Sequence, residues 1–337
     1  MTGDLWTRWA ERNAAAGFID ACLRGVGQIF FQNNPLCGAV LLAGLFWGAY
    51  AEGRPYVAYG ALAGVVVATA TARLLRADRS AVAQGLFGFN GALVGAALPT
   101  FLGPGIALGG YVVLGAAVST VVTLAIANVV KAWRVPGSTA PFVLTAWLLL
   151  LAAYSFAGIP MAAMGPPALP PPAAPATHFA PDAAAALAIL AKNVSQVYLV
   201  ENVVTGALFL VAIGIGSWRC ALFAVLGSAV SVAVAVAFGA KAAAIGAGLF
   251  GFSAVLTAIA VGAVFNAPSL RATLYAMLAT VFTVIAQAAL DTALTPVGIP
   301  TLTFPYVLAM WLFLLPKIDV VPEPHHQPVP NGVASAD

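Results

Sequence analysis

Two short stretches, "GQIFFQNNPLCG" at residues 27–38 and "SQVYLVENVVTG" at residues 195–206, resemble each other although they lie far apart in the chain. Both stretches have glutamine in second place, asparagine in eighth place and glycine in twelfth place, and most other positions exchange similar residues. Their offset, 196 − 28 = 168, is about half of the 337 residues. Polar side chains recurring in this way between apolar segments indicate an internal repeat.

Two further blocks recur in the same order. "GLFGFNGALV" (85–94) and "GLFGFSAVLT" (248–257) share six of ten positions at an offset of 248 − 85 = 163. "STAPFVLTAWLLLL" (138–151) and "LTFPYVLAMWLFLL" (302–315) share eight of fourteen positions at an offset of 302 − 138 = 164. Because the three offsets differ by at most five residues, the sequence predicts two homologous halves with small changes in their loops.

The composition predicts a membrane protein. The chain is 62% hydrophobic and 7% charged, with a mean hydropathy of +0.98, whereas a soluble domain carries roughly 25% charged residues. Its apolar runs are long enough to cross a hydrocarbon core of ~30 Å. The runs are continuous rather than alternating, which favours helices over a barrel of strands. We therefore expect an all-α polytopic membrane protein, and the net charge of +3 gives no indication of a nucleic-acid partner.

Each half is expected to contain about five transmembrane helices and one re-entrant half-helix. In the first half the spans are predicted at 15–33, 35–51, 56–75, 105–131 and 139–157, and the glycine-broken half-helix at 81–101. An odd number of spans turns the second half over in the membrane, so the two halves would be inverted repeats.

The predicted organisation has five parts. These are an interfacial segment at 1–16, a first membrane repeat at 17–158, a proline-rich linker at 159–183, a second membrane repeat at 184–317 and a tail at 318–337. With both termini placed in the cytoplasm, eight lysine and arginine residues lie inside and four lie outside, in the direction of the positive-inside rule. The linker falls outside and contains neither lysine nor arginine.

Residues at matched positions of the two halves are called twins below. Inverted repeats place a binding site where broken helices of both halves meet, so polar twins are the candidates. Amide and hydroxyl groups offer neutral donors and acceptors that can replace the hydration of a small solute, and flat rings beside them suit a planar one. The relevant twins are Gln28 and Gln196, Thr139 and Thr303, Phe89 and Phe252, and Leu93 and Leu256.

Each kind of twin also has a purely structural interpretation. The glutamines suit hydrogen bonds between helices, the phenylalanines suit core packing, and the threonines, each shortly before a proline, suit helix N-caps. The sequence leaves these interpretations open. Asp20 and Arg24, one turn apart, are expected to form an ion pair.

The paired segments of the types "GQxxFxNNP", "GLFGFNGxLVG" and "TxPF" resemble the bacterial branch of the urea transporter family, from about Gly17 to Pro316. The resemblance implies a passive, channel-like urea permease of the bacterial cytoplasmic membrane, not an enzyme. It also implies a homotrimer in the lipid bilayer, with one pore inside each protomer and no cofactor or metal.

The resemblance further assigns residues to the path. It implies outer and inner urea sites at Gln28 and Gln196, flanked by Ile29 and Val197. The slots of rings and leucines would be formed by Phe31, Phe89, Phe252, Leu93 and Leu256, and the narrow middle by Thr139 and Thr303.

The second half departs from the first at two places. Leu199 stands where the first half has Phe31, so we expect one face of the inner slot to be aliphatic. Residues 201–203 read Glu-Asn-Val where residues 33–35 read Asn-Asn-Pro. The two sites are therefore not expected to be strictly symmetrical.

Other functions remain open on the sequence alone. An ion-coupled secondary transporter would need a titratable site, and the candidates in the second half, Glu201 and Asp291, have no acidic twins. A pore for short amides, ammonia or water would use similar neutral groups. An intramembrane enzyme is disfavoured because all three histidines lie outside the predicted spans.

Overall fold

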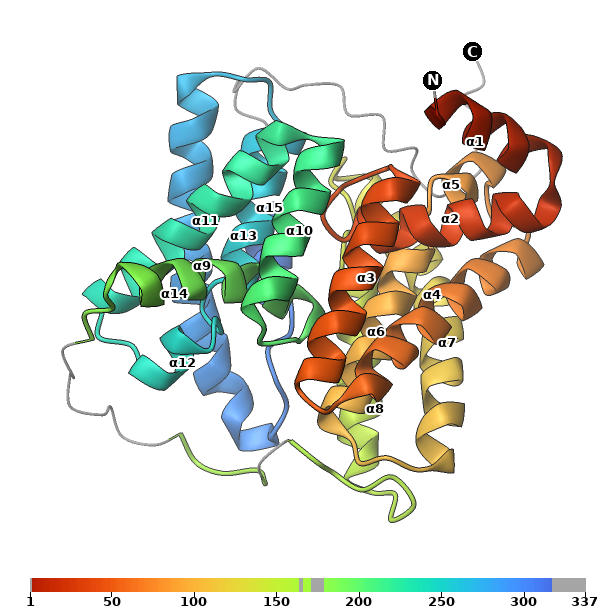
Figure 1. Ribbon diagram of the computed structural model, residues 1–337. Helices are drawn as coiled ribbons and strands as arrows, with labels where there is room; N and C mark the ends of the chain where they lie inside the picture. The colour runs from red at the N-terminus through yellow and green to blue at the C-terminus, as the bar shows by residue number, and fades with distance from the viewer. Residues whose placement is uncertain (1, 164–165, 171–178, 317–337) are drawn as a thin grey trace.

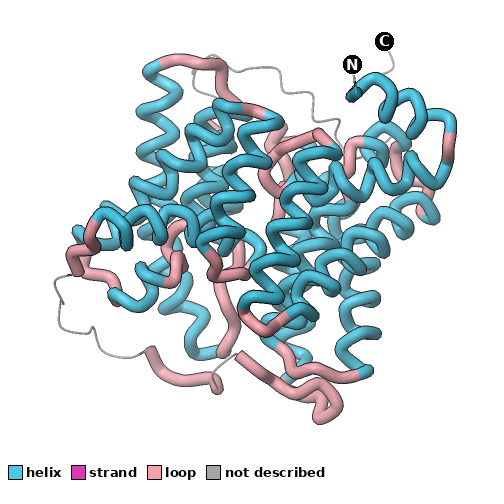
Figure 2. Tube along the Cα trace, viewed as in Figure 1, coloured by secondary structure: helices cyan, strands magenta, loops and turns pink. Residues whose placement is uncertain are grey.

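The computed structural model describes residues 2–163, 166–170 and 179–316 (Figure 1). The predicted tail at 318–337 and part of the predicted linker lie outside these residues. The described residues form helices and loops without a β-strand, apart from one isolated bridge between Leu102 and Met161 (Figure 2). The prediction of an all-α protein with many apolar helices is confirmed.

The helices form two series with the same order. The first series follows α1 (Thr2–Arg12) and consists of α2 (Ala14–Gln28), α3 (Pro35–Ala51), α4 (Pro55–Leu74), α5 (Arg79–Ala83), α6 (Gly88–Phe101), α7 (Ile106–Lys131) and α8 (Ala140–Ala153). The second series consists of α9 (Ala183–Ser195), α10 (Val203–Gly216), α11 (Trp218–Ala237), α12 (Ala242–Gly246), α13 (Phe252–Ile259), α14 (Leu270–Leu294) and α15 (Phe304–Leu314).

Three single turns complete the second series. They are η1 (Gln196–Tyr198) after α9, the π-helical turn η2 (Ala260–Val264) after α13, and η3 (Thr295–Val297) after α14. In Figure 1 the first series, red to yellow, occupies the right of the view and the second, green to blue, the left. Helices α3 and α10 pack against each other at the boundary between the two series.

Residues 27–38 and 195–206 form the same structure in both series: one helix ends, and the next begins after a short non-helical segment, called a break below. Phe31 and Leu199 each have a φ of 61°, in the left-handed region that ends a helix. Asn34 then caps α3 by accepting a 2.9 Å bond from the Leu36 amide. Asn202 caps α10 in the same way. The break bends the second-half pair, residues 183–198 and 203–216, by 76°.

The lengths of the spans differ from the prediction. Within the described residues, length and composition qualify four helices as membrane spans, namely α4, α7, α11 and the segment beginning at α14, or five if the bent pair counts as one. The span predicted at 139–157 is the 14-residue helix α8, which at ~1.5 Å per residue is shorter than a ~30 Å core. The span predicted at 15–33 likewise ends at Gln28. Helix α2 stops at Gln28, where polar side chains gather at the break, and α8 stops at Ala153; a count of apolar residues detects neither end.

Helices α4 and α6 approach each other very closely through glycines. A Cβ atom added to Gly64 would lie 2.1 Å from the Gly91 carbonyl oxygen, and one added to Gly95 would lie 2.0 Å from that of Gly60. Small residues allow such backbone contact between membrane helices. As a result, α6 is buried along most of its length.

The two halves interlock through reciprocal contacts. The Trp147 indole nitrogen donates to the Pro300 carbonyl at 2.8 Å, and its twin Trp311 donates to the Pro136 carbonyl, twin of Pro300, at 2.8 Å. The same bond thus occurs twice between the halves, with the roles of the two halves exchanged. The repeat found in the sequence therefore continues into the tertiary contacts.

Candidate functional site

The twinned glutamines lie at the two breaks and make the same hydrogen bond. Gln28, the last residue of α2, donates from Nε2 to the Gln84 carbonyl at 2.8 Å. Gln196, the first residue of η1, donates from Nε2 to the Ala247 carbonyl at 2.8 Å. The interpretation of the glutamines as links between segments is therefore correct for their amide nitrogens. Each amide oxygen is left to accept from another group.

The twinned threonines meet. Thr303 Oγ1 donates to Thr139 Oγ1 at 2.8 Å, and both residues are almost completely buried. They are the N-cap residues of α8 and α15, yet neither hydroxyl caps its helix, so the N-cap interpretation of the side chains is wrong. Because the hydroxyls bond each other, the N-termini of two helices converge here, and their partial positive charges disfavour a cation.

The aromatic residues of the first break lie against the second half. The Phe31 ring makes edge contacts with Phe265, at a centroid distance of 5.9 Å, and with Tyr306, at 6.4 Å. The Tyr306 hydroxyl is hydrogen-bonded to Ser138. Tyr306 was not singled out from the sequence, although its position in the third repeated block, next to Pro305, was a signal that could have found it.

The remaining predicted residues differ in burial. Phe89 and Phe252 are partly buried and pack against the core, whereas Leu93 and Leu256 are completely buried. Ile29 and Val197, beside the glutamines, are also buried. Phe89 and Phe252 therefore contact the core, as the core-packing interpretation expects, but neither ring is fully buried.

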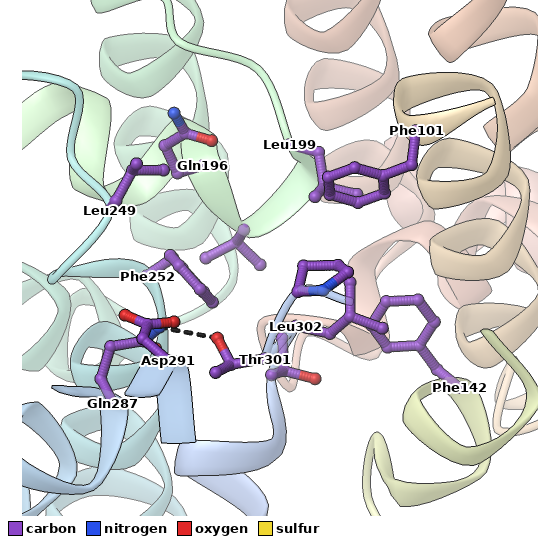
Figure 3. A pocket seen from close by; sticks show the side chains of 13 residues that line it. Phe101, Phe142, Gln196, Leu199, Leu249, Phe252, Gln287, Asp291, Thr301 and Leu302 are labelled. Carbon is purple, nitrogen blue, oxygen red and sulfur yellow. Dashed lines mark hydrogen bonds between the residues drawn. The ribbon is translucent and has the colours of Figure 1, made fainter. Parts of the chain in front are cut away.

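A cavity of about 230 Å³ lies at the boundary between the halves (Figure 3). It is lined by Phe101, Phe142, Gln196, Val197, Leu199, Leu249, Phe252, Gln287, Asp291, Pro300, Thr301, Leu302 and Thr303. Five of the predicted residues are thereby brought together, all from the second half: Gln196, Val197, Leu199, Phe252 and Thr303. The other seven lie outside this lining: Gln28, Ile29, Phe31, Phe89, Leu93, Leu256 and Thr139.

Three polar residues of the cavity were not predicted as binding residues. Gln287 Nε2 donates to Asp291 Oδ1 at 3.0 Å and to Thr301 Oγ1 at 2.7 Å. The sequence had marked Asp291 only as a possible coupling residue. Gln287 was missed because its twin, 287 − 164 = 123, is a threonine, and the search accepted only polar residues with similar twins.

Charged residues hold the two breaks in place. Arg24 bonds Asp20 at 2.6 Å, as predicted, and also donates to the Asn33 side chain at 2.9 Å. Its twin Lys192 forms an ion pair with Glu201 at 2.7 Å. Since the charge of Glu201 is compensated by Lys192, this carboxylate is a poor candidate for a coupling site.

Comparisons with known proteins agree with this arrangement. The family model described as urea transporter matches residues 19–318. Urea transporter 1 of Ovis aries and that of Capra hircus are each 32% identical to this chain over 324 residues, covering 94% of the chain and 82% of the relative. Urea transporter 1 of Rattus norvegicus is similar to the same extent. Since the match covers nearly the whole chain, including both breaks and the paired threonines, the chain belongs to the urea transporter family.

Proposed function

We propose that this chain is a passive, channel-like permease for urea, and not an enzyme. The observation that carries the proposal is the buried hydroxyl pair of Thr139 and Thr303, placed where a helix of each half begins. Urea has amino groups that donate and a carbonyl that accepts, so neutral hydroxyl and amide groups can replace its bonds to water one by one. The converging helix N-termini oppose a cation at this point, which favours a neutral solute.

The path runs from a mouth at the first break to a mouth at the second break. Gln28 and Gln196 bind urea at the two mouths, next to Ile29 and Val197. Phe31, Phe89 and Leu93 form one slot, and Leu199, Phe252 and Leu256 form the other. The shared cavity of Gln196, Leu199, Phe252 and Thr303 supports the second-half part of this path.

The same proposal includes the membrane arrangement. The repeats at 17–158 and 184–317 are inverted, with about five spans and a half-helix each, and both termini face the cytoplasm of a bacterium. The reciprocal tryptophan bonds and the contact of a threonine with its own twin support a twofold relation between the repeats. The homotrimer with one pore in each protomer rests on the family resemblance.

Urea flux into proteoliposomes tests the proposal. We expect urea to move down its own gradient at the same rate with and without proton or sodium gradients. An ion-coupled transporter, the alternative that Asp291 keeps open, would lose net uptake when those gradients are collapsed. Parallel measurements with thiourea, acetamide and glycerol separate a urea path from a pore for small neutral solutes in general.

A further inference from the structure

Gln287 carries an acceptor atom that has no partner. The residue belongs to α14, is 3% exposed and lines the cavity. Its Nε2 donates to Asp291 and Thr301, whereas its Oε1 is buried without a hydrogen-bond partner. The amide nitrogen is directed at a carboxylate oxygen of Asp291, which accepts from it. Because buried polar atoms are nearly always bonded in native proteins, and because Gln287 lines the cavity, its free Oε1 is available to a solute there.

The polar groups around this oxygen are mostly acceptors. Figure 3 shows the Asp291 carboxylate and the Gln287 amide together on one side of the cavity, below Phe252 and close to Thr301. The amide nitrogens of Gln287 and Gln196 are already bonded to protein acceptors. A solute that brings several N–H groups therefore fits this cavity better than one that brings mainly acceptors. The Phe252 ring beside these groups favours a flat solute.

The first half has no equivalent acceptors at the twin positions. Position 123, the twin of Gln287, holds a threonine whose hydroxyl donates to the Ser119 carbonyl at 2.7 Å and accepts from Asn90 at 3.2 Å. The twin of Asp291, at 291 − 164 = 127, is the buried Ala127. The two mouths are therefore chemically unequal.

We infer that Gln287 and Asp291 form an acceptor recess that determines the specificity of the second-half mouth. The recess binds planar solutes with two amino groups on one carbon, as in urea, in preference to solutes with one amino group or with hydroxyl groups. This inference rests on the proposed function, because it names residues that select the same solute. It adds a step that selects the solute at the second-half mouth only, whereas the twinned residues are present at both mouths.

Two variants test the recess. Gln287→Met keeps the length of the side chain but removes the whole amide, both the free acceptor and the nitrogen that donates to Asp291 and Thr301. Asp291→Asn keeps the shape and replaces one acceptor oxygen by a donor. Each should raise the half-saturation concentration for urea about three- to tenfold, the effect of one lost hydrogen bond. The half-saturation concentration for acetamide, which has one amino group, should change less. In the double variant, the half-saturation concentration for urea should rise by less than the product of the two single-variant increases, because the two side chains share one hydrogen-bond network.

Ser253→Ala is the matched control. Ser253 lies in the same half, is 1% exposed and has a buried hydroxyl without a partner, but it does not line the cavity. Its loss should leave the ratio of urea to acetamide half-saturation unchanged. Thermal unfolding of each purified variant checks folding, and Asp291→Asn, at the exposed end of the recess, remains informative if Gln287→Met does not fold.

The outcomes separate the two proposals. If the wild-type chain carries no urea, the permease proposal fails. If the wild type carries urea but both variants keep the wild-type ratio of urea to acetamide, the recess is wrong and the permease stands. A gradient-dependent uptake that disappears in Asp291→Asn would make Asp291 a coupling residue and overturn the recess as a selector of neutral solutes.

Discussion

At the scale of single residues, the hydroxyls of Thr139 and Thr303 join positions that are 164 residues apart at a distance of 2.8 Å. Each hydroxyl is the nearest partner of the other in a buried place, so removing one leaves the other unpaired. An unpaired buried hydroxyl costs about 1–3 kcal/mol. In the proposed path, the pair would exchange its mutual bond for bonds to a passing solute.

Thr139→Val and Thr303→Val should each slow urea flux about tenfold or more, because a valine keeps the shape but cannot bond the solute. Stopped-flow light scattering of proteoliposomes measures the flux. Thr145→Val is the control, since Thr145 is equally buried on α8 but its hydroxyl has no partner. Unchanged flux in both variants would place the path elsewhere.

The glutamines give a second prediction at this scale. Gln28→Ala and Gln196→Ala each remove an amide oxygen from one mouth, so each should weaken urea binding by ~0.5–1.5 kcal/mol per lost bond. The effects should be nearly additive, because the two glutamines bond different carbonyls, those of Gln84 and Ala247. The measurement is the half-saturation concentration of both single variants and the double variant. A double variant no weaker than one single variant would mean that both glutamines serve one site.

At the scale of helices, the end of α2 is positioned by close contact with the turn between α5 and α6. Gly85 in this turn has a φ of 75°, and a Cβ added there would lie 2.2 Å from the backbone nitrogen of Gly25. The preceding carbonyl, that of Gln84, accepts the Gln28 side chain. The glycine therefore sets both the approach of the elements and the orientation of a candidate binding residue.

Gly85→Ala should destabilise the protein strongly, because the new methyl group would meet backbone that cannot move aside. Gly53→Ala is the matched control: its φ is 69°, but nothing lies within 4 Å of the added Cβ. This control should show only the cost of the left-handed conformation, about 1–2 kcal/mol. Thermal unfolding of the purified variants compares the two, and equal losses would mean that the close contact at Gly85 is unimportant.

At the scale of the whole molecule, the two halves are held by bonds that occur in exchanged pairs. Trp147 and Trp311 reach across to carbonyls of the opposite half, those of Pro300 and Pro136. Each carbonyl lies shortly before one of the paired threonines, so the bonds also position the segments that lead into the site. The arrangement links the docking of the halves to the placement of Thr139 and Thr303.

Trp147→Phe and Trp311→Phe should lower the free energy of unfolding by similar amounts, about 0.5–1.5 kcal/mol each, because each loses one hydrogen bond but keeps an aromatic ring. Trp218→Phe, at a tryptophan that is 70% exposed, should have little effect. Denaturation in detergent measures the three variants. A large loss in only one of the variants at Trp147 and Trp311, which are both partly buried, would argue against equivalent roles for the twins.

The class of the fold, the internal repeat and the family could all be inferred without the structure. Apolar composition and the periodic blocks are local properties, so they predicted membrane helices and two halves without knowledge of long-range contacts. The breaks were also visible, because Asn34 and Asn202 are N-cap residues whose effect is confined to one turn. The expected span at 139–157 begins as predicted but is too long, because the helix ends at Ala153 and the length of an apolar run does not show where a helix ends.

Which polar groups of the candidate site remain available depends on contacts between residues that are distant in the chain. That the glutamine nitrogens are used, that the threonines bond each other rather than cap their helices, and that Gln287 and Asp291 share a cavity all depend on residues distant in the chain. The similarity between the two halves did not point to Gln287, because its twin, Thr123, has different chemistry. A hydrogen bond forms only between groups that lie close together in space, and which distant groups lie close together depends on the packing of the whole molecule.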